Sequence, residues 1–135
     1  MDQPDSPDHP DTLGSRHSFA SWRGEAGDAA GAATDFEQLL ADMVRVLGPE
    51  HANTLNTRNN LTFWRGKAGD AAGAVTDFEQ LLADRLRVLG PDHPDTLTTR
   101  NSLAYFRGKA RDAPMGLIKR FKAVFQLPVV GSGPV

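Results

Sequence analysis

Residues 49–90 read PEHANTLNTRNNLTFWRGKAGDAAGAVTDFEQLLADRLRVLG, and most of this text occurs more than once in the chain. Residues 26–42 and residues 68–84 differ at one position only, where Ala33 corresponds to Val75. The motif HPDTL at residues 9–13 returns at residues 93–97, two periods of 42 residues later. A period of this length is typical of solenoids, in which each unit buries its apolar face by stacking on the next unit. The sequence therefore predicts a stack of repeats.

Each copy is predicted to form two helices joined by a short turn. Proline in the HPDTL motif suits the first turn of a helix, so the first helix is expected to begin near residues 9, 51 and 93. It is expected to end before the glycine-rich turns, at Arg23, Arg65 and Arg107. The second helix is expected to begin at the capping residues Asp28, Asp70 and Asp112 and to end at Gly48 and Gly90.

The expected core follows the apolar spacing. In the second helix, Val75, Phe78, Leu82, Leu86 and Leu89 recur at steps of three and four residues, which is typical of one buried face of an amphipathic helix. The predicted core anchors of the first helix are Phe19, Leu61 and Leu103. Gly31 and Gly73 interrupt the start of the second helix, where we expect them to allow a neighbouring helix to approach closely.

The third copy departs from the repeat after Arg111. Pro114 is compatible only with the first turn of a helix, so the sequence predicts that a helix restarts near Asp112. Its apolar residues are Leu117, Ile118, Phe121, Val124 and Phe125. Two interpretations stay open for residues 112–126: a capping helix that closes the last repeat, or a basic amphipathic helix that binds a partner or a membrane surface.

The predicted fold is all-α: a right-handed α-solenoid of about three antiparallel helix pairs with a divergent C-terminal capping helix. Residues 1–8 are expected to form a disordered acidic tail. Residues 9–126 are expected to form the solenoid, with repeats at about 9–48, 49–90 and 91–126. Residues 127–135 are expected to form a C-terminal tail.

Composition limits the classes of function. The net charge of −2 and the pI near 6.0 give no reason to expect a nucleic-acid partner. The chain has no cysteine, which excludes disulfides and thiolate metal sites. No signal peptide and no apolar run of about 20 residues is seen, so we expect a cytoplasmic protein for which a membrane partner is unlikely. No cofactor or metal is expected either, because helix capping explains the Asp-His-Pro-Asp text at residues 92–95.

The repeated residues resemble those of tetratricopeptide repeat proteins, in particular the 42-residue kind found in kinesin light chains. The resemblance covers about residues 9–111. It is carried by Leu61, Thr62, Gly69, Ala74 and Phe78, followed by Leu-Gly-Pro-Asp-His-Pro at residues 89–94. It implies antiparallel helix pairs whose first helices line a concave groove, the surface on which such proteins usually bind an extended peptide or a partner helix.

On that groove, we expect asparagine side chains to hold a peptide backbone, because each offers both a donor and an acceptor, and aromatic side chains to anchor the partner. The alternatives are a solvated helix surface and burial in the core. The candidate peptide-binding residues are His17, Ser21, Asn56, Asn59, Asn60, Phe63, Asn101 and Tyr105.

Arginines at positions 16, 58 and 100 recur in step with Asp35, Asp77, Glu37 and Glu79, which predicts ion pairs between helices. No nucleophile, base and orienting acid share a repeated pattern, so an enzyme is not expected. The predicted function is a protein–protein interaction module. The alternative is a structural role, as a self-associating fragment of a longer repeat array in a bacterial signalling or regulatory protein.

Overall fold

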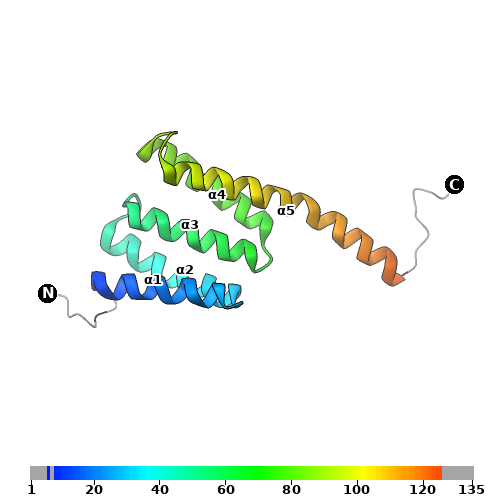
Figure 1. Ribbon diagram of the computed structural model, residues 1–135, viewed down its shortest axis with the longest axis horizontal. Helices are drawn as coiled ribbons and strands as arrows, with labels where there is room; N and C mark the ends of the chain where they lie inside the picture. Colours follow the sequence, from blue (N-terminus) through cyan, green and yellow to red (C-terminus); the bar gives the residue numbers. More distant parts are fainter. Residues whose placement is uncertain (1–5, 7, 126–135) are drawn as a thin grey trace.

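The computed structural model describes Ser6 and residues 8–125, with side chains through Asp112, and this part of the chain contains five α-helices and no strand (Figure 1). The helices are α1 (Pro10–Glu25), α2 (Ala29–Leu47), α3 (Ala52–Lys67), α4 (Ala71–Leu89) and α5 (Pro94–Phe125). The predicted all-α repeat fold is confirmed. The predicted C-terminal tail and most of the predicted N-terminal tail lie outside the described residues.

Side chains cap the helices as the sequence predicts. The imidazoles of His9 and His51 accept hydrogen bonds from the backbone N–H two residues on, and Asp28 and Asp70 accept from the N–H groups of Gly31 and Gly73 at 2.9 Å. These two glycines mainly make room for the cap, which the sequence did not predict: a Cβ at Gly31 or Gly73 would overlap the capping carboxylate. A Cβ at Gly31 would also meet the Arg23 side chain of the neighbouring helix α1.

The turn between paired helices depends on one glycine. α1 and α3 each run two residues further than predicted, and the chain then turns at Gly27 and Gly69, whose φ angles are +107° and +122°. Residues with a Cβ are strained in this region of φ. The corresponding residue of the third copy is Arg111.

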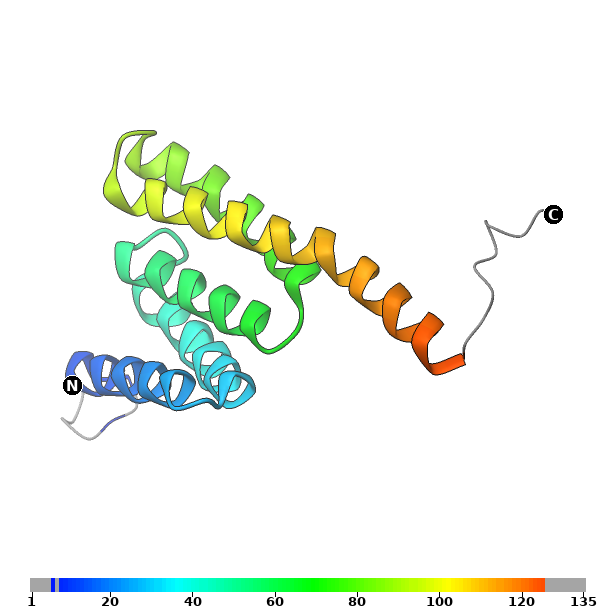
Figure 2. The same cartoon turned by 45° about the vertical axis from the view of Figure 1, so that its right-hand side comes forward.

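The third turn is therefore absent, and α5 is one continuous helix from Pro94 to Phe125. The prediction that a new helix starts near Asp112 was wrong, and the described part of the chain has two complete helix pairs followed by a single long helix. Figure 2 shows that the C-terminal half of α5 runs past α4 and away from the other helices.

Two apolar clusters join the copies. Phe36 and Leu39 of α2 pack with Leu61 of α3, and Phe78 and Leu81 of α4 pack with α5. Phe36 and Phe78 are fully buried. Because Leu61 belongs to the second copy and packs into the cluster of the first, the copies stack through a shared core.

Of the five residues predicted to form the buried face of α4, only Phe78 is buried. The other four, Val75, Leu82, Leu86 and Leu89, are half-buried, because the face that packs on the neighbouring helices is centred on Ala74, Phe78 and Leu81.

The odd-numbered helices lie on the inner side of the stack. α3 contacts both α1 and α5, whereas α2 and α4 make no close contact in the described part of the chain. Glycine permits this approach, since a Cβ at Gly24 would overlap the ring of Trp64 and a Cβ at Gly66 would overlap that of Phe106. The stack therefore curves toward α1, α3 and α5.

Phe19 is not a core residue, contrary to the prediction. Its side chain is 60% exposed, whereas the corresponding Leu61 is 6% exposed. Leu61 is covered because α3 packs on α2, and no helix precedes α1 within the described residues. Trp22, on the same side of α1, is 69% exposed for the same reason.

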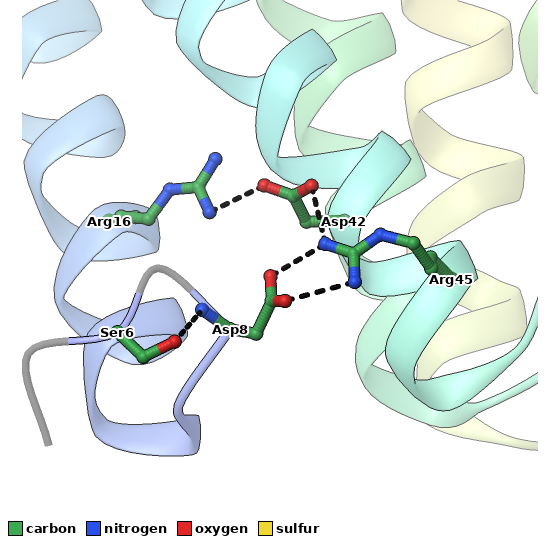
Figure 3. Close-up of polar contacts among 5 residues, drawn as sticks. All are labelled: Ser6, Asp8, Arg16, Asp42 and Arg45. Atoms are coloured by element: carbon green, nitrogen blue, oxygen red, sulfur yellow. Dashed lines mark hydrogen bonds and ion pairs between the residues drawn. The ribbon is translucent and has the colours of Figure 1, made fainter. Parts of the chain in front are cut away.

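Ion pairs link the two helices of each pair, but with other partners than predicted. Arg16 bonds Asp42 at 2.7 Å, and Arg45 joins Asp42 to Asp8, so that Asp8 is anchored although it was assigned to the tail (Figure 3). These hydrogen bonds hold the pKa of the Asp42 and Asp8 carboxyls below the usual value. The second copy repeats this network, with its members in the same register: Arg58, Asp84, Arg87 and Glu50.

The acids expected to pair with Arg16 and Arg58 serve the arginines at the helix ends instead. Arg65 binds Asp77 within its own pair at 2.8 Å and Glu37 of the preceding pair at 3.2 Å.

No helix in the described part of the chain is long and apolar enough to cross a membrane.

Candidate functional site

Each odd-numbered helix keeps one stripe of residues that neighbouring helices leave open. In α3 the stripe consists of Asn53, Asn56, Asn60, Phe63 and Lys67, all exposed or half-buried. The same register gives the stripes of α1 and α5: Asp11, Gly14, Ser18, Ser21 and Glu25, and Asp95, Thr98, Ser102, Tyr105 and Lys109. We call these three stripes the inner face.

Five of the eight predicted site residues lie on the inner face: Ser21, Asn56, Asn60, Phe63 and Tyr105. The other three, His17, Asn59 and Asn101, share the neighbouring register position, which faces the next odd-numbered helix. Asn59 is 8% exposed and accepts a hydrogen bond from the Thr99 hydroxyl at 3.4 Å. Asn59 therefore serves the seam between α3 and α5 and is too buried to hold a peptide. Asn101 is exposed on α5.

His17 closes the seam between α1 and α3. Its Nε2 lies 2.7 Å from Nδ2 of Asn60, and its ring meets Phe36 edge-on at 5.1 Å. With Nδ2 of Asn60 as the donor, Nε2 of His17 is the acceptor, and this arrangement requires the neutral imidazole. Burial lowers the pKa of His17, which favours the same neutral form.

Two lysines flank the aromatic residues at one end of the inner face. Lys67 Nζ lies 3.4 Å from the Tyr105 hydroxyl, and both Lys67 and Lys109 lie 5.5 Å from the centroid of the Tyr105 ring. Phe63 contacts Trp64 and Phe106 edge-on and is half-buried. Neither lysine was among the residues predicted from the sequence, although they occupy corresponding positions of the second and third copies.

A pocket of about 380 Å³ opens at the other end, between the first halves of α1 and α3 and the end of α2. The pocket was not predicted from the sequence, because its apolar lining residues come from two helices, α1 and α2, whose packing the repeat pattern does not specify. These residues, which we call the floor, are Leu13, Met43, Val46 and Leu47. The remaining lining residues of the pocket are Asp8, Pro10, Gly14, His17, His51, Asn53 and Asn56.

This surface offers amide donors and acceptors, aromatic rings, two ammonium groups and an apolar pocket. No three His, Asp or Glu side chains come together as a metal site within the residues that the structure describes.

Paired antiparallel helices, a shared core and a curved inner face define a helical repeat protein, an α-solenoid. A family model described as tetratricopeptide repeat matches residues 12–53 and 54–95, and the chain belongs to this family. The predicted resemblance is thus confirmed. A search of curated proteins finds no match.

Two solved structures are similar to this chain, and both are described as nearly identical TPR-like repeats of a putative kinesin light chain from Podosopora anserina. One is identical to this chain at 26% of positions with a TM-score of 0.68, and the match covers 90% of this chain and 60% of the other. The second structure carries a glutamine-to-methionine substitution; it has 26% identity and a TM-score of 0.65, and the match covers 88% of this chain and 58% of the other. This chain therefore spans less than two thirds of the length of either.

Proposed function

We propose that this protein is a protein-interaction module that binds an extended peptide along its inner face. Tetratricopeptide repeats generally bind protein partners, which supports the class of function. The observation that carries the proposal is the row of unused polar groups on α3. Asn53 and Asn56 are exposed, and neither carboxamide has a hydrogen-bond partner within the described residues.

The length and charge of the inner face suggest what kind of peptide it binds. Asn53 and Lys67 are 14 positions apart, which is about 21 Å along a helix. An extended peptide spans about 3.3 Å per residue, so about six residues cover this length. Lys67 and Lys109 favour a carboxylate at their end, in the ordinary manner of charge-assisted hydrogen bonds.

A selection of random peptides of about 16 residues displayed on phage tests the proposal. Selected peptides are expected to bind the chain and to lose at least about tenfold in affinity when Asn56→Ala is combined with Tyr105→Ala. The matched control is Gln38→Ala with Gln80→Ala, which changes exposed residues of α2 and α4. Binding that survives the first pair, or is lost equally in both, would remove the inner face as the site.

A second candidate function is self-association through the face of α1 that carries Phe19 and Trp22. Exposed Phe19 and Trp22 favour it, since their counterparts Leu61 and Trp64 are packed against the preceding copy. Large exposed apolar patches are often contact surfaces. Sedimentation at tens of micromolar should then show a dimer that Phe19→Ser with Trp22→Ser converts to monomer, and a monomeric parent chain would reject this role.

A further inference from the structure

We propose that the pocket at the first end of the inner face takes one large apolar side chain, of leucine size, from an extended peptide. The inference rests on the function proposed above and names the anchor residue of its ligand. Four observations support the inference: the differences between the two copies, the chemistry of the residues that line the pocket, the free amides at its edge and the volume of the pocket.

Seven of the eleven residues that line the pocket differ from their counterparts 42 positions later. Two of these differences place a larger or charged residue in the second copy: Gly14 corresponds to Asn56, and Met43 corresponds to Arg85. A Cβ added at Gly14 would meet no heavy atom within 4 Å, so the space beside Gly14 is empty on this side of the pocket. Leu13, Val46 and Leu47 of the pocket floor are unchanged in the second copy, as Leu55, Val88 and Leu89.

The pocket walls offer no unpaired charge to a ligand. The carboxylate of Asp8 is held by Arg45 at 2.6 and 2.9 Å, and the imidazole of His17 is neutral. A charged side chain placed on the apolar floor would lose its hydration without gaining a partner. The anchor is therefore uncharged and apolar.

The rim indicates that the main chain around the anchor is extended. Asn53 and Asn56 follow each other on one face of α3, at the edge of the pocket, with free carboxamides. A helical partner has used its backbone N–H and C=O groups internally, whereas an extended segment still offers them. Two free amides beside an apolar floor therefore suit an extended peptide with one side chain inserted.

The volume agrees with a single side chain and its flanking main chain. At about 380 Å³ the pocket lies near the lower end of the range for ligand sites, roughly 300–1,000 Å³.

N-acetyl-L-leucine N-methylamide, added to the ¹⁵N-labelled full chain, tests the pocket directly by NMR. We expect shifts confined to the amides of residues that line the pocket, with a Kd of about 1 mM. The alanine analogue should bind about tenfold or more weakly, because it lacks three carbon atoms of apolar surface. Equal shifts with both compounds, or shifts scattered over the chain, would overturn the proposal.

Gly14→Asn copies the second repeat and should abolish the leucine shifts. Its matched control is Gly108→Asn, since a Cβ at Gly108 also meets nothing within 4 Å but lies outside the pocket. Leucine shifts that persist in Gly14→Asn would refute the inference. Both variants are expected to keep the circular dichroism spectrum of the parent chain.

The peptide selection separates this inference from the proposed function. Selected peptides that need Asn56 and Tyr105, but bind equally well to Gly14→Asn, would retain the function and reject the anchor pocket. A leucine probe that binds while no peptide is selected would reject the peptide function and assign the pocket to a free small molecule. Support requires that the selected peptides share a leucine-sized residue and that this residue no longer contributes to binding in Gly14→Asn.

Discussion

Replacing Arg85 by methionine, the residue that the first copy has at this position, is expected to stabilise the protein. Arg85 is 2% exposed, and its guanidinium donates to the backbone carbonyl of Asp95 at 3.0 Å and to the hydroxyl of Thr99 at 2.8 Å. Its Nε has no partner, and no carboxylate forms an ion pair with it among the described residues. Burial lowers the pKa of this guanidinium accordingly.

The size of the effect follows from what the substitution removes. Each lost hydrogen bond from a charged donor costs ~1.5–3 kcal/mol, but the desolvation of a buried ion costs several kcal/mol. The Asp95 carbonyl is not orphaned, because the single hydrogen of the Thr99 hydroxyl can be donated to it at 3.2 Å, with Asn59 Oδ1 at 3.4 Å as the alternative acceptor. Buried ionic groups replaced by apolar residues of similar volume give changes from zero to a gain of ~1–4 kcal/mol. We expect a gain of about 1–2 kcal/mol for Arg85→Met.

Urea unfolding followed by circular dichroism measures this gain as a higher midpoint with an unchanged slope. The accompanying rise in Tm should be about 4–8 °C. Arg85→Ala is the control, since it removes the same charge but leaves a cavity, and should be ~2–5 kcal/mol less stable than Arg85→Met. If Arg85→Met loses more than about 1 kcal/mol, its hydrogen bonds outweigh the desolvation and the reasoning is refuted.

Four further predictions concern the core, the seams, the turn and a histidine. Phe78→Ala should cost about 3–5 kcal/mol in urea unfolding, because its ring is fully buried, and an effect near zero would contradict the assigned core. Gly66→Ala should destabilise by about 1–3 kcal/mol through overlap with the ring beside it, whereas Gly108→Ala, in open space, should be neutral or stabilising by up to about 1 kcal/mol; equal effects would argue against close packing of the odd-numbered helices. Arg111→Gly should weaken the continuous helix, seen as faster amide hydrogen exchange between residues 108 and 114, and unchanged exchange would mean that this residue does not decide the turn. The pKa of His17 is lowered by burial, so the folded protein binds a proton at this imidazole less readily than the unfolded chain. The contribution of neutral His17 to the stability of the fold is therefore complete above about pH 6.5, and it is lost as the pH falls from there through the folded pKa. An NMR titration of His17 with a midpoint at or above about 6.5 would contradict this.

The repeated sequence predicted the class of fold and part of the core, because both depend on local spacing. Phe36 and Phe78 recur 42 residues apart on an apolar stripe, and a stripe must be buried wherever the fold is stable. Phe19 has the same register as Leu61 but not the same surroundings. Its exposure arises because no helix of the described residues lies before α1, which a repeat pattern alone does not express.

The site was harder to predict, because it depends on which neighbour covers each position. Asn59 and Asn60 are adjacent in sequence, yet one is buried beneath α5 and the other lies on the inner face. The two asparagines can be distinguished only when the contacts of α3 with α1 and α5 are known, because these contacts decide which positions of α3 are covered. The pocket required still more, since its floor combines Leu13 with Met43, which come together through packing of α1 on α2.

The single arginine at the third turn was visible in the sequence, and its consequence could have been derived. Arg111 stands where Gly27 and Gly69 adopt positive φ. The apolar residues that follow directed attention to a separate helix, but backbone strain at the turn decides whether the chain can reverse at all.

The ionic networks have a consequence for how such an array grows. One network closes within residues 8–45 and the other within residues 50–87, so each acid of a network has its base inside the same stretch. A tandem duplication of the underlying gene segment would therefore deliver this network complete with each added unit. The pairs Arg65–Glu37 and Arg107–Glu79 join one copy to the next instead, so they form only when a neighbouring unit is present.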